Sequence, residues 1–141
     1  MLAVVRVRGS VHMKQVFKDT LRMLRLERIN HCVLVPETPT YNGMITSVSA
    51  YVTWGPLEKD VLEKLVRKRG RLPGNKRLSE EEAKRVLQHI EEKQSLKYAG
   101  IKPVFALSPP TKGYKSIKQA YPKGDLGCRG EKINTLLRRM I

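Results

Sequence analysis

The densest group of side chains that could do chemistry is a run of six cations between residues 67 and 77, with no acidic residue among them. These cations are Arg67, Lys68, Arg69, Arg71, Lys76 and Arg77. Glycine and proline in the same run let the backbone turn tightly. Guanidinium groups donate forked hydrogen bonds to phosphate oxygens, so a turning basic segment can follow a phosphate chain. The alternative is a solvated loop, but so dense a cluster without acids favours phosphate contact.

A second group of cations lies in the first 31 residues, around a predicted amphipathic helix. The polar face of that helix carries Lys14, Lys18, Arg22 and Arg25, and the predicted strand ends beside it carry Arg6, Arg8, Arg28 and His31. Every surface helix turns a polar face to water, so the helical stripe indicates nucleic-acid contact and simple solvation about equally. His31 fits either such contact or packing within its strand.

A third group lies in residues 101–141, which carry nine basic and two acidic side chains. The basic side chains of this group that could contact nucleic acid are Lys112, Lys115, Lys118, Lys123, Arg129, Lys132, Arg138 and Arg139. Tyr114 and Tyr121 are interleaved with them, a mixture that suits irregular RNA with splayed bases. Packing of both tyrosines on their own domain is the favoured alternative. The many Gly and Pro residues predict that this tail is the least compact part of the chain.

The net charge of +15 calls for an anionic partner, and by itself it fits nucleic acid or an anionic membrane surface. No run approaches the ~20 apolar residues of a membrane span. The first ten residues contain two arginines where a signal peptide would need an unbroken apolar stretch. We therefore expect a soluble, cytoplasmic protein without a membrane partner.

Signals for catalysis, cofactors and metals are weak. GRLPGNK lacks the spacer and the Ser or Thr of a phosphate-binding P-loop, and GDLGCRG has the wrong glycine spacing for a dinucleotide site. There is no nucleophile elbow and no HExxH pair. His12 and His89 lack a partner at i+4, and two cysteines are too few for a disulfide scaffold. We expect no enzyme activity, no cofactor, no metal and no small-molecule substrate.

The first 54 residues predict a β-α-β-α-β order, which belongs to the α/β (α+β) class. Strands are expected near 2–8, 31–35 and 50–54. Met13, Val16, Phe17, Thr20, Leu21 and Leu24 predict the buried face of the first helix, with Ser10 as its cap. Thr38-Pro39 predicts the start of the second helix. Right-handed crossovers would place both helices on one face of a three-stranded sheet, leaving the other face to be covered or functional.

The remainder of the chain predicts a helical insertion and a basic extension. Apolar spacing predicts helices around 61–66 and 83–90, the second opened by a capping box from Ser79 to Glu82. A strand is expected near 104–107 and a short helix over 133–140. The predicted divisions are a core at 1–54, a helical insertion with its basic loop at 55–100, and an extension at 101–141.

Several separated strings resemble one known family. They are RLERINHCVLVPETPTYNGMI, VTWG, KRGRLPGNKR and LGCRGEKINTLLRRM, and they resemble the large-subunit ribosomal protein called L thirty in archaea and L seven in eukaryotes. The resemblance runs over essentially the whole chain. It implies a ferredoxin-like core, no catalysis, and a structural role in binding large-subunit ribosomal RNA near the 5S RNA, beside other ribosomal proteins. TKGY at 111–114 and Asp125 depart from the family pattern.

By matching segments, the resemblance implies RNA contact at Arg8, Arg25, Arg28, Asn30, His31 and the 67–77 cluster. The full predicted interface comprises Arg8, Lys14, Arg25, Arg28, Asn30, His31, Arg67, Lys68, Arg69, Arg71, Lys76, Arg77, Lys112, Lys115, Lys118, Arg129, Lys132, Arg138 and Arg139. We expect replacement of Arg69 and Arg71 by alanine to weaken RNA affinity and to spare thermal stability. The alternative function is an RNA-processing or ribosome-assembly factor built on the same fold.

Overall fold

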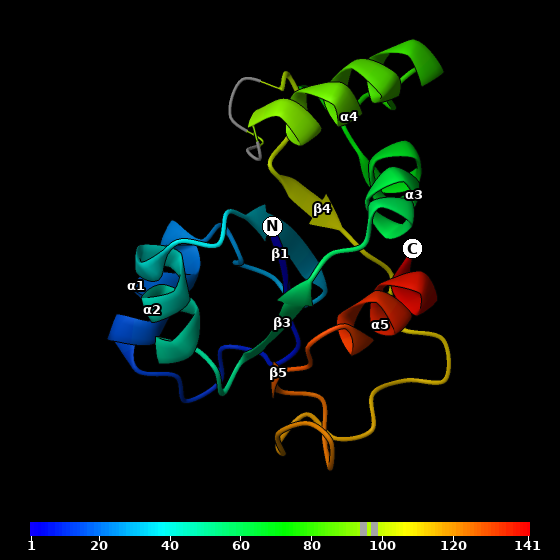
Figure 1. Cartoon of the computed structure of the whole chain (residues 1–141). Coiled ribbons are helices and arrows are strands. Elements are labelled where there is room, and N and C mark those ends of the chain that lie inside the picture. The colour runs from blue at the N-terminus through cyan, green and yellow to red at the C-terminus, as the bar shows by residue number, and fades with distance from the viewer. Residues whose placement is uncertain (94–95, 97–98) are drawn as a thin grey trace.

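The computed structural model describes residues 1–93, 96 and 99–141 (Figure 1). Its first five elements follow the predicted order: β1 (Leu2–Arg6), α1 (Gln15–Met23), β2 (His31–Val35), α2 (Pro39–Ser47) and β3 (Val52–Pro56). Five more elements follow: α3 (Lys59–Arg69), α4 (Glu80–Lys93), β4 (Val104–Ala106), β5 (Gly127–Cys128) and α5 (Lys132–Met140). The predicted β-α-β-α-β core is confirmed.

The strands form one mixed sheet in the order β4-β2-β1-β3-β5. The central strand β1 pairs antiparallel with both β2 and β3, so β2 and β3 run parallel to each other on either side of it. β4 extends the sheet beyond β2, at the place where a strand was expected. β5 pairs parallel with β3 and was not predicted, because two residues are too few to show a hydrophobic period.

Each face of the sheet is covered by helices, because alternate strand residues point to opposite faces. Val4 belongs to the apolar cluster that contains Leu21 of α1 and Ile45 of α2, so these two helices share one face, as predicted. Its neighbour Val5 belongs to the cluster formed with α3, α4 and α5 on the other face (Figure 1). The second face of the sheet, which the sequence analysis left as either covered or functional, is therefore covered by helices and is part of the core.

The first helix begins later than predicted. α1 starts at Gln15 after Lys14, which provides no side-chain cap, whereas Ser10 accepts a hydrogen bond from Arg6 instead of capping the helix. Val16 was expected on the buried face, yet 71% of it is exposed. The buried stripe follows residues 17, 21 and 24, spaced by one helical turn, and position 16 lies well to the side of that stripe.

The starts of α2 and α4 are as predicted. Thr38 Oγ1 accepts a hydrogen bond from the Tyr41 backbone N–H at 3.4 Å, with Pro39 in the first turn of α2. At α4, Glu82 N–H donates to Ser79 Oγ and Ser79 N–H donates to the Glu82 carboxylate, which completes the capping box. The backbone N–H of Ser79 lowers the pKa of Glu82. These contacts are local, which is why short sequence motifs predict them.

The end of the tail belongs to the apolar cluster that Val5 forms with α3, α4 and α5. Ile133, Leu136, Leu137 and Met140 of α5 are buried there. A Cβ at Gly55 of β3 would collide with the carbonyl of Gly130, so the backbones of β3 and the start of α5 approach closely. The expectation that the tail is the least compact region is therefore wrong for its last helix, because the apolar stripe of α5 packs against the sheet.

Candidate nucleic-acid interface

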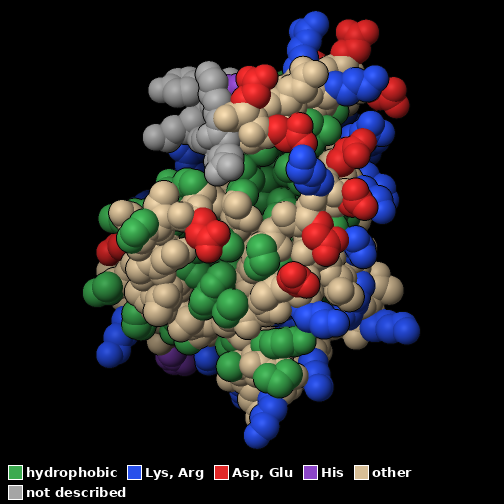
Figure 2. Space-filling view, viewed as in Figure 1, with side chains coloured by type: hydrophobic (Ala, Val, Ile, Leu, Met, Phe, Trp, Pro, Cys, Tyr) green, Lys and Arg blue, Asp and Glu red, His purple; other side chains and the backbone are tan. Residues whose placement is uncertain are grey.

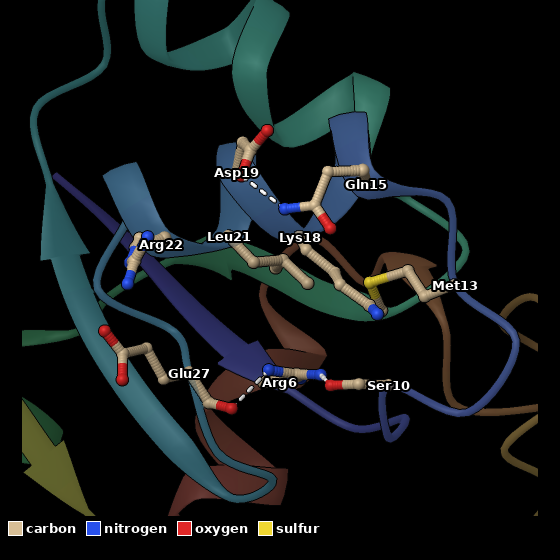
Figure 3. A pocket seen from close by; sticks show the side chains of 9 residues that line it. All are labelled: Arg6, Ser10, Met13, Gln15, Lys18, Asp19, Leu21, Arg22 and Glu27. Carbon is tan, nitrogen blue, oxygen red and sulfur yellow. Dashed lines mark hydrogen bonds between the residues drawn. The ribbon is translucent and has the colours of Figure 1, made fainter.

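Arg6 was expected to extend the basic surface, but the structure buries it, with 3% of the residue exposed. Its Nη1 donates to the carbonyls of Leu26 and Glu27 at 2.7 and 2.6 Å, and its Nη2 donates to Ser10 Oγ at 2.6 Å (Figure 3). Its Nε donates to the Arg8 carbonyl at 3.0 Å. Arg6 thus links the segment after β1 to the turn before β2, and it is a structural residue.

The turn between α1 and β2 presents exposed cations at one end of the sheet. Arg25 and Asn30 both adopt left-handed backbone conformations, with φ values of 60° and 63°. Arg25 and Arg28 are exposed, and the Asn30 backbone N–H donates to the Arg6 carbonyl at 2.8 Å. The strained turn is therefore held against β1 while its basic side chains face solvent.

His31 is half-buried at the start of β2, and its Nδ1 is buried without a hydrogen-bond partner. Burial lowers the pKa of His31, and the positive charges of Arg28 and Arg6 lower it further. The ring is therefore neutral near pH 7. Of the two interpretations left open by the sequence, the geometry favours packing within the strand.

Arg8 and Lys14 lie in the segment between β1 and α1. The guanidinium of Arg8 lies over the ring of Tyr51, with 5.7 Å between its central carbon and the ring centroid. Arg8 is half-buried and Lys14 is exposed. A guanidinium in contact with an aromatic ring keeps its positive charge, and its N–H groups can still donate to a phosphate. Both residues therefore reach the surface.

The end of α3 lies near the same end of the sheet. Arg69 donates to Ser108 Oγ and to the carbonyl of Ile141 at 3.1 Å. The neighbouring backbone N–H of Leu107 donates to the carbonyl of Asn30 at 3.1 Å. Arg67 and Lys68 are exposed beside Arg69, and Arg67 is paired with Glu63 at 2.7 Å. The last turn of α3 is thus connected by hydrogen bonds to the basic turn before β2.

Residues 71–77 form a small ordered hairpin rather than an open loop. Arg71 and Arg77 form an antiparallel bridge, and the backbone N–H of Leu72 donates to the Lys76 carbonyl at 2.9 Å. Lys102 ties the hairpin to the segment before β4 through its backbone bond to the Arg71 carbonyl, at 2.8 Å. Lys76 and Arg77 are exposed on its second arm. The hairpin therefore projects these cations from a fixed backbone.

The predicted tail cations fall into two groups. Lys112, Lys115, Lys118 and Lys132 are exposed. The other three, Arg129, Arg138 and Arg139, are engaged within the chain. Arg138 pairs with Glu58 at 2.9 Å, and Arg139 donates to the carbonyls of Thr111 and Gly113. Bonds to neutral carbonyls leave the positive charge of Arg139 uncompensated.

Arg129, among the predicted tail cations, is held by a largely buried ion pair. Its side chain is 7% exposed and is paired with Asp125, whose side chain is also 7% exposed. Its Nε donates to Thr53 Oγ1 at 3.1 Å, and its guanidinium lies 5.3 Å from the ring centroid of Tyr121. Its Nε and Nη2 groups are therefore bonded inside the fold, and its charge is balanced by Asp125. This geometry favours a structural role, and the RNA contact of Arg129 stays a prediction.

The remaining predicted cations are not neutralised by acids. Within the described part of the chain, ion pairs involve Lys59, Arg67, Arg129 and Arg138. Figure 2 shows Lys and Arg side chains along the right and lower margins of one face, whereas Asp and Glu side chains are scattered among hydrophobic and other side chains over its middle and upper part. The described residues contain no group of three His, Cys, Asp or Glu side chains able to hold a metal. Among them, no helix is long and apolar enough to cross a membrane.

Comparison with known proteins decides the family. The sequence model of the ribosomal protein L30p/L7e family matches residues 2–52. The chain is 50% identical to the large ribosomal subunit protein uL30 of Methanococcus maripaludis, over 99% of this chain and 98% of that protein. Identity to the uL30 proteins of Archaeoglobus fulgidus and Methanosphaera stadtmanae is 46% and 43%, over 99% and 100% of both chains. The chain belongs to the L30p/L7e family.

The L30p/L7e family model and the full-length relatives match different extents of the chain. The family model covers β1 through the start of β3, which is the β-α-β-α-β unit. The full-length relatives extend the likeness over α3, α4 and the tail. The predicted resemblance is thereby confirmed. The assignment of individual RNA contacts stays a prediction.

Sequence reasoning missed the residues that hold this L30p/L7e surface in place. Arg6 could have been recognised, because it occupies a strand position flanked by Val5 and Val7, where an exposed arginine is unexpected. Asp125 was noted only as a departure from the family pattern. Its carboxylate accepts from the backbone N–H groups of Lys115 and Ser116, as well as from Arg129. No local signal predicts these contacts.

Proposed function

We propose that this member of the L30p/L7e family is a structural, non-enzymatic component of the large ribosomal subunit that binds the RNA of that subunit. The relatives named above are large ribosomal subunit proteins. The observation that carries the proposal is the convergence of cations from the turn before β2 and the end of α3 near Asn30, with the 71–77 hairpin following directly on α3. These segments are far apart in sequence, so only the fold brings the first two together.

The mode of binding would be contact with phosphates. Exposed Arg25, Arg28, Lys76 and Arg77 project from backbones held by internal hydrogen bonds, so little order would have to be gained on binding. Lysine and arginine contacts to phosphate position a protein on RNA without reading its sequence. Displacement of counterions should lower log affinity by roughly 0.7–0.9 per contact for each tenfold rise in salt.

The finer partners rest on the family resemblance. We propose contact with large-subunit RNA in the neighbourhood of the 5S RNA, and with neighbouring ribosomal proteins. The Lys and Arg side chains along the right and lower margins of the face in Figure 2 support a phosphate-bearing partner.

The competing assembly-factor hypothesis predicts a different number of copies of this chain per mature large subunit. Native lysate would be fractionated on a density gradient at moderate salt, and this chain would be quantified against known large-subunit proteins. One copy per mature large subunit is expected. Presence only in precursor particles would instead assign the chain to assembly.

The contribution of the hairpin can be measured separately. The double variant Lys76→Ala, Arg77→Ala should lower the steepness of the salt dependence of RNA affinity by roughly 1.4–1.8 log units per decade of salt, as expected for two lost phosphate contacts. The double variant Lys84→Ala, Arg85→Ala removes the same charge from the exposed face of α4. It should leave the slope unchanged, and an equal fall in both variants would contradict the proposed surface.

A further inference from the structure

Residues of the tail line an open hollow that is not part of the proposed phosphate contacts near Asn30. Its volume is ≈ 540 Å³, twice the ≈ 270 Å³ of the hollow around Arg6. Its lining includes Lys112, Lys115, Tyr121, Asp125, Arg129 and Arg139. Sites for small organic groups measure roughly 300–1,000 Å³, so the tail hollow can hold a group of the size of one nucleotide.

The charge of this hollow is positive. Asp125 is neutralised by its buried pair with Arg129. Lys112 and Lys115 are exposed and form no ion pair with any described residue, and Arg139 donates only to carbonyl oxygens. Three cations therefore surround a cavity whose single acid is already paired, which is an arrangement suited to a phosphate group.

The hollow also contains an aromatic ring in a fixed position. The guanidinium of Arg129 lies 5.3 Å from the centroid of the Tyr121 ring, and Arg129 is itself held by Asp125 and Thr53. Tyr121 remains 36% exposed. A ring supported in this way can stack against a planar group at low entropic cost. RNA bases are such groups, but only unpaired bases leave their own helix to stack on a protein.

We infer that the tail hollow binds one unpaired RNA nucleotide, with its base stacked on Tyr121 and its phosphate held by Lys112, Lys115 and Arg139. This inference rests on the proposed RNA-binding function and deepens it. The basic surface near Asn30 contacts helical RNA through phosphates, whereas the tail selects RNA that carries a bulged or looped-out base. The buried Asp125–Arg129 pair shapes the hollow without contacting the nucleotide.

The test compares two RNA probes with the full chain. One probe is a short hairpin with a single bulged adenosine, and the other is the same hairpin fully paired. Wild-type protein should prefer the bulged probe. Tyr121→Ala should weaken affinity for the bulged probe by roughly 5- to 100-fold, the range produced by loss of one base–aromatic stack, and should not change affinity for the paired probe. Tyr121→Phe should retain the preference.

A pair of lysine double variants tests the phosphate contacts of the hollow without changing the packing of Tyr121. Lys112→Ala with Lys115→Ala should reduce the preference for the bulged probe. Lys118→Ala with Lys123→Ala removes equal charge from exposed positions of the same segment outside the hollow, and should reduce affinity for both probes alike. Thermal melts would verify that each variant folds.

The outcomes separate the inference from the function on which it rests. Salt-dependent binding of both probes with equal affinity by the wild-type protein would overturn the nucleotide site and leave the RNA-binding function intact. A bulge preference that survives in folded Tyr121→Ala would also overturn the site. Failure of the wild-type protein to bind either probe, or large-subunit RNA, would overturn the proposed function itself.

Discussion

The hydroxyl of Tyr114 donates a hydrogen bond to Oδ1 of Asn30 at 2.7 Å, across 84 positions of the chain. Asn30 also donates its backbone N–H to the Arg6 carbonyl and accepts from the backbone N–H of Leu107. One residue with a left-handed backbone thus connects β1, the end of β4 and the tail. The bond fixes the tail against the end of the sheet at which the predicted RNA interface lies.

Replacement of Tyr114 by phenylalanine should reduce stability. The ring would still pack, but Asn30 Oδ1 would lose its partner, at a cost of about 1 kcal/mol in the free energy of unfolding. Urea denaturation measures this change. Tyr41→Phe is the matched control, because the described residues offer no hydrogen bond to the Tyr41 hydroxyl. Equal effects of the two substitutions would show that the Tyr114–Asn30 bond contributes nothing.

Tyr114 should also make stability depend on alkaline pH. Burial, and next the negative charge of Asp125, raise the pKa of Tyr114 to about 12 from an ordinary value of 10.0. Between these values the unfolded chain loses a proton that the folded chain keeps, so the free energy of unfolding falls as pH rises. Tyr114→Phe should fall less steeply over this window. Parallel declines in the two proteins, measured by urea denaturation at several pH values, would argue against this shift.

Arg6→Lys should destabilise the fold although it preserves the charge. A lysine ammonium cannot reproduce the forked bonds to Leu26, Glu27 and Ser10, and the expected loss is on the order of 3 kcal/mol. Amide hydrogen exchange should accelerate first in the turn before β2. Arg22→Lys provides the control, since its exposed side chain forms no hydrogen bond within the described residues. Unchanged exchange in that turn would contradict the structural role of Arg6.

The buried Asp125–Arg129 pair should show strong coupling. Asp125→Asn alone leaves a buried guanidinium without its counter-ion and should cost about 3–5 kcal/mol. The double variant Asp125→Asn, Arg129→Gln should be less destabilised than the sum of the single variants. Lys59→Ala removes a partner from the exposed pair with Glu91 and should cost less than about 1 kcal/mol. Additive effects in the Asp125 cycle would refute the coupling.

The adjacent residues Lys68 and Arg69 should have different roles. Arg69→Ala removes bonds to Ser108 and to the chain end, so it should lower the free energy of unfolding by about 1–3 kcal/mol. The bonds of Arg69 therefore argue against the expectation that replacement of Arg69 and Arg71 by alanine spares thermal stability. Lys68→Ala should leave stability unchanged and reduce the salt slope of RNA affinity by roughly 0.7–0.9. The reverse assignment in melts and titrations would refute this division.

Much of the fold was predictable because its signals are local. The caps at Thr38 and at Ser79–Glu82 use residues three positions apart, and the apolar stripe of α5 repeats with the helical period. The start of α1 was misplaced because Ser10, a good cap by type, is bonded to Arg6 instead. Strand β5 was missed because its two residues are ordered by their pairing with β3 and not by their own pattern.

The sequence alone determined the family, the order of the core elements and the basic character of the surface. Matching sequence segments, hydrophobic periodicity and net charge do not depend on the tertiary contacts between distant parts of the chain. The tertiary structure decided which cations are available. Arg6 and Arg129 have the same side chain as Arg25 and Arg28, yet the first two are used inside the fold and the others face solvent. That difference depends on carbonyl and carboxylate groups supplied by distant segments, which only folding brings within hydrogen-bond distance.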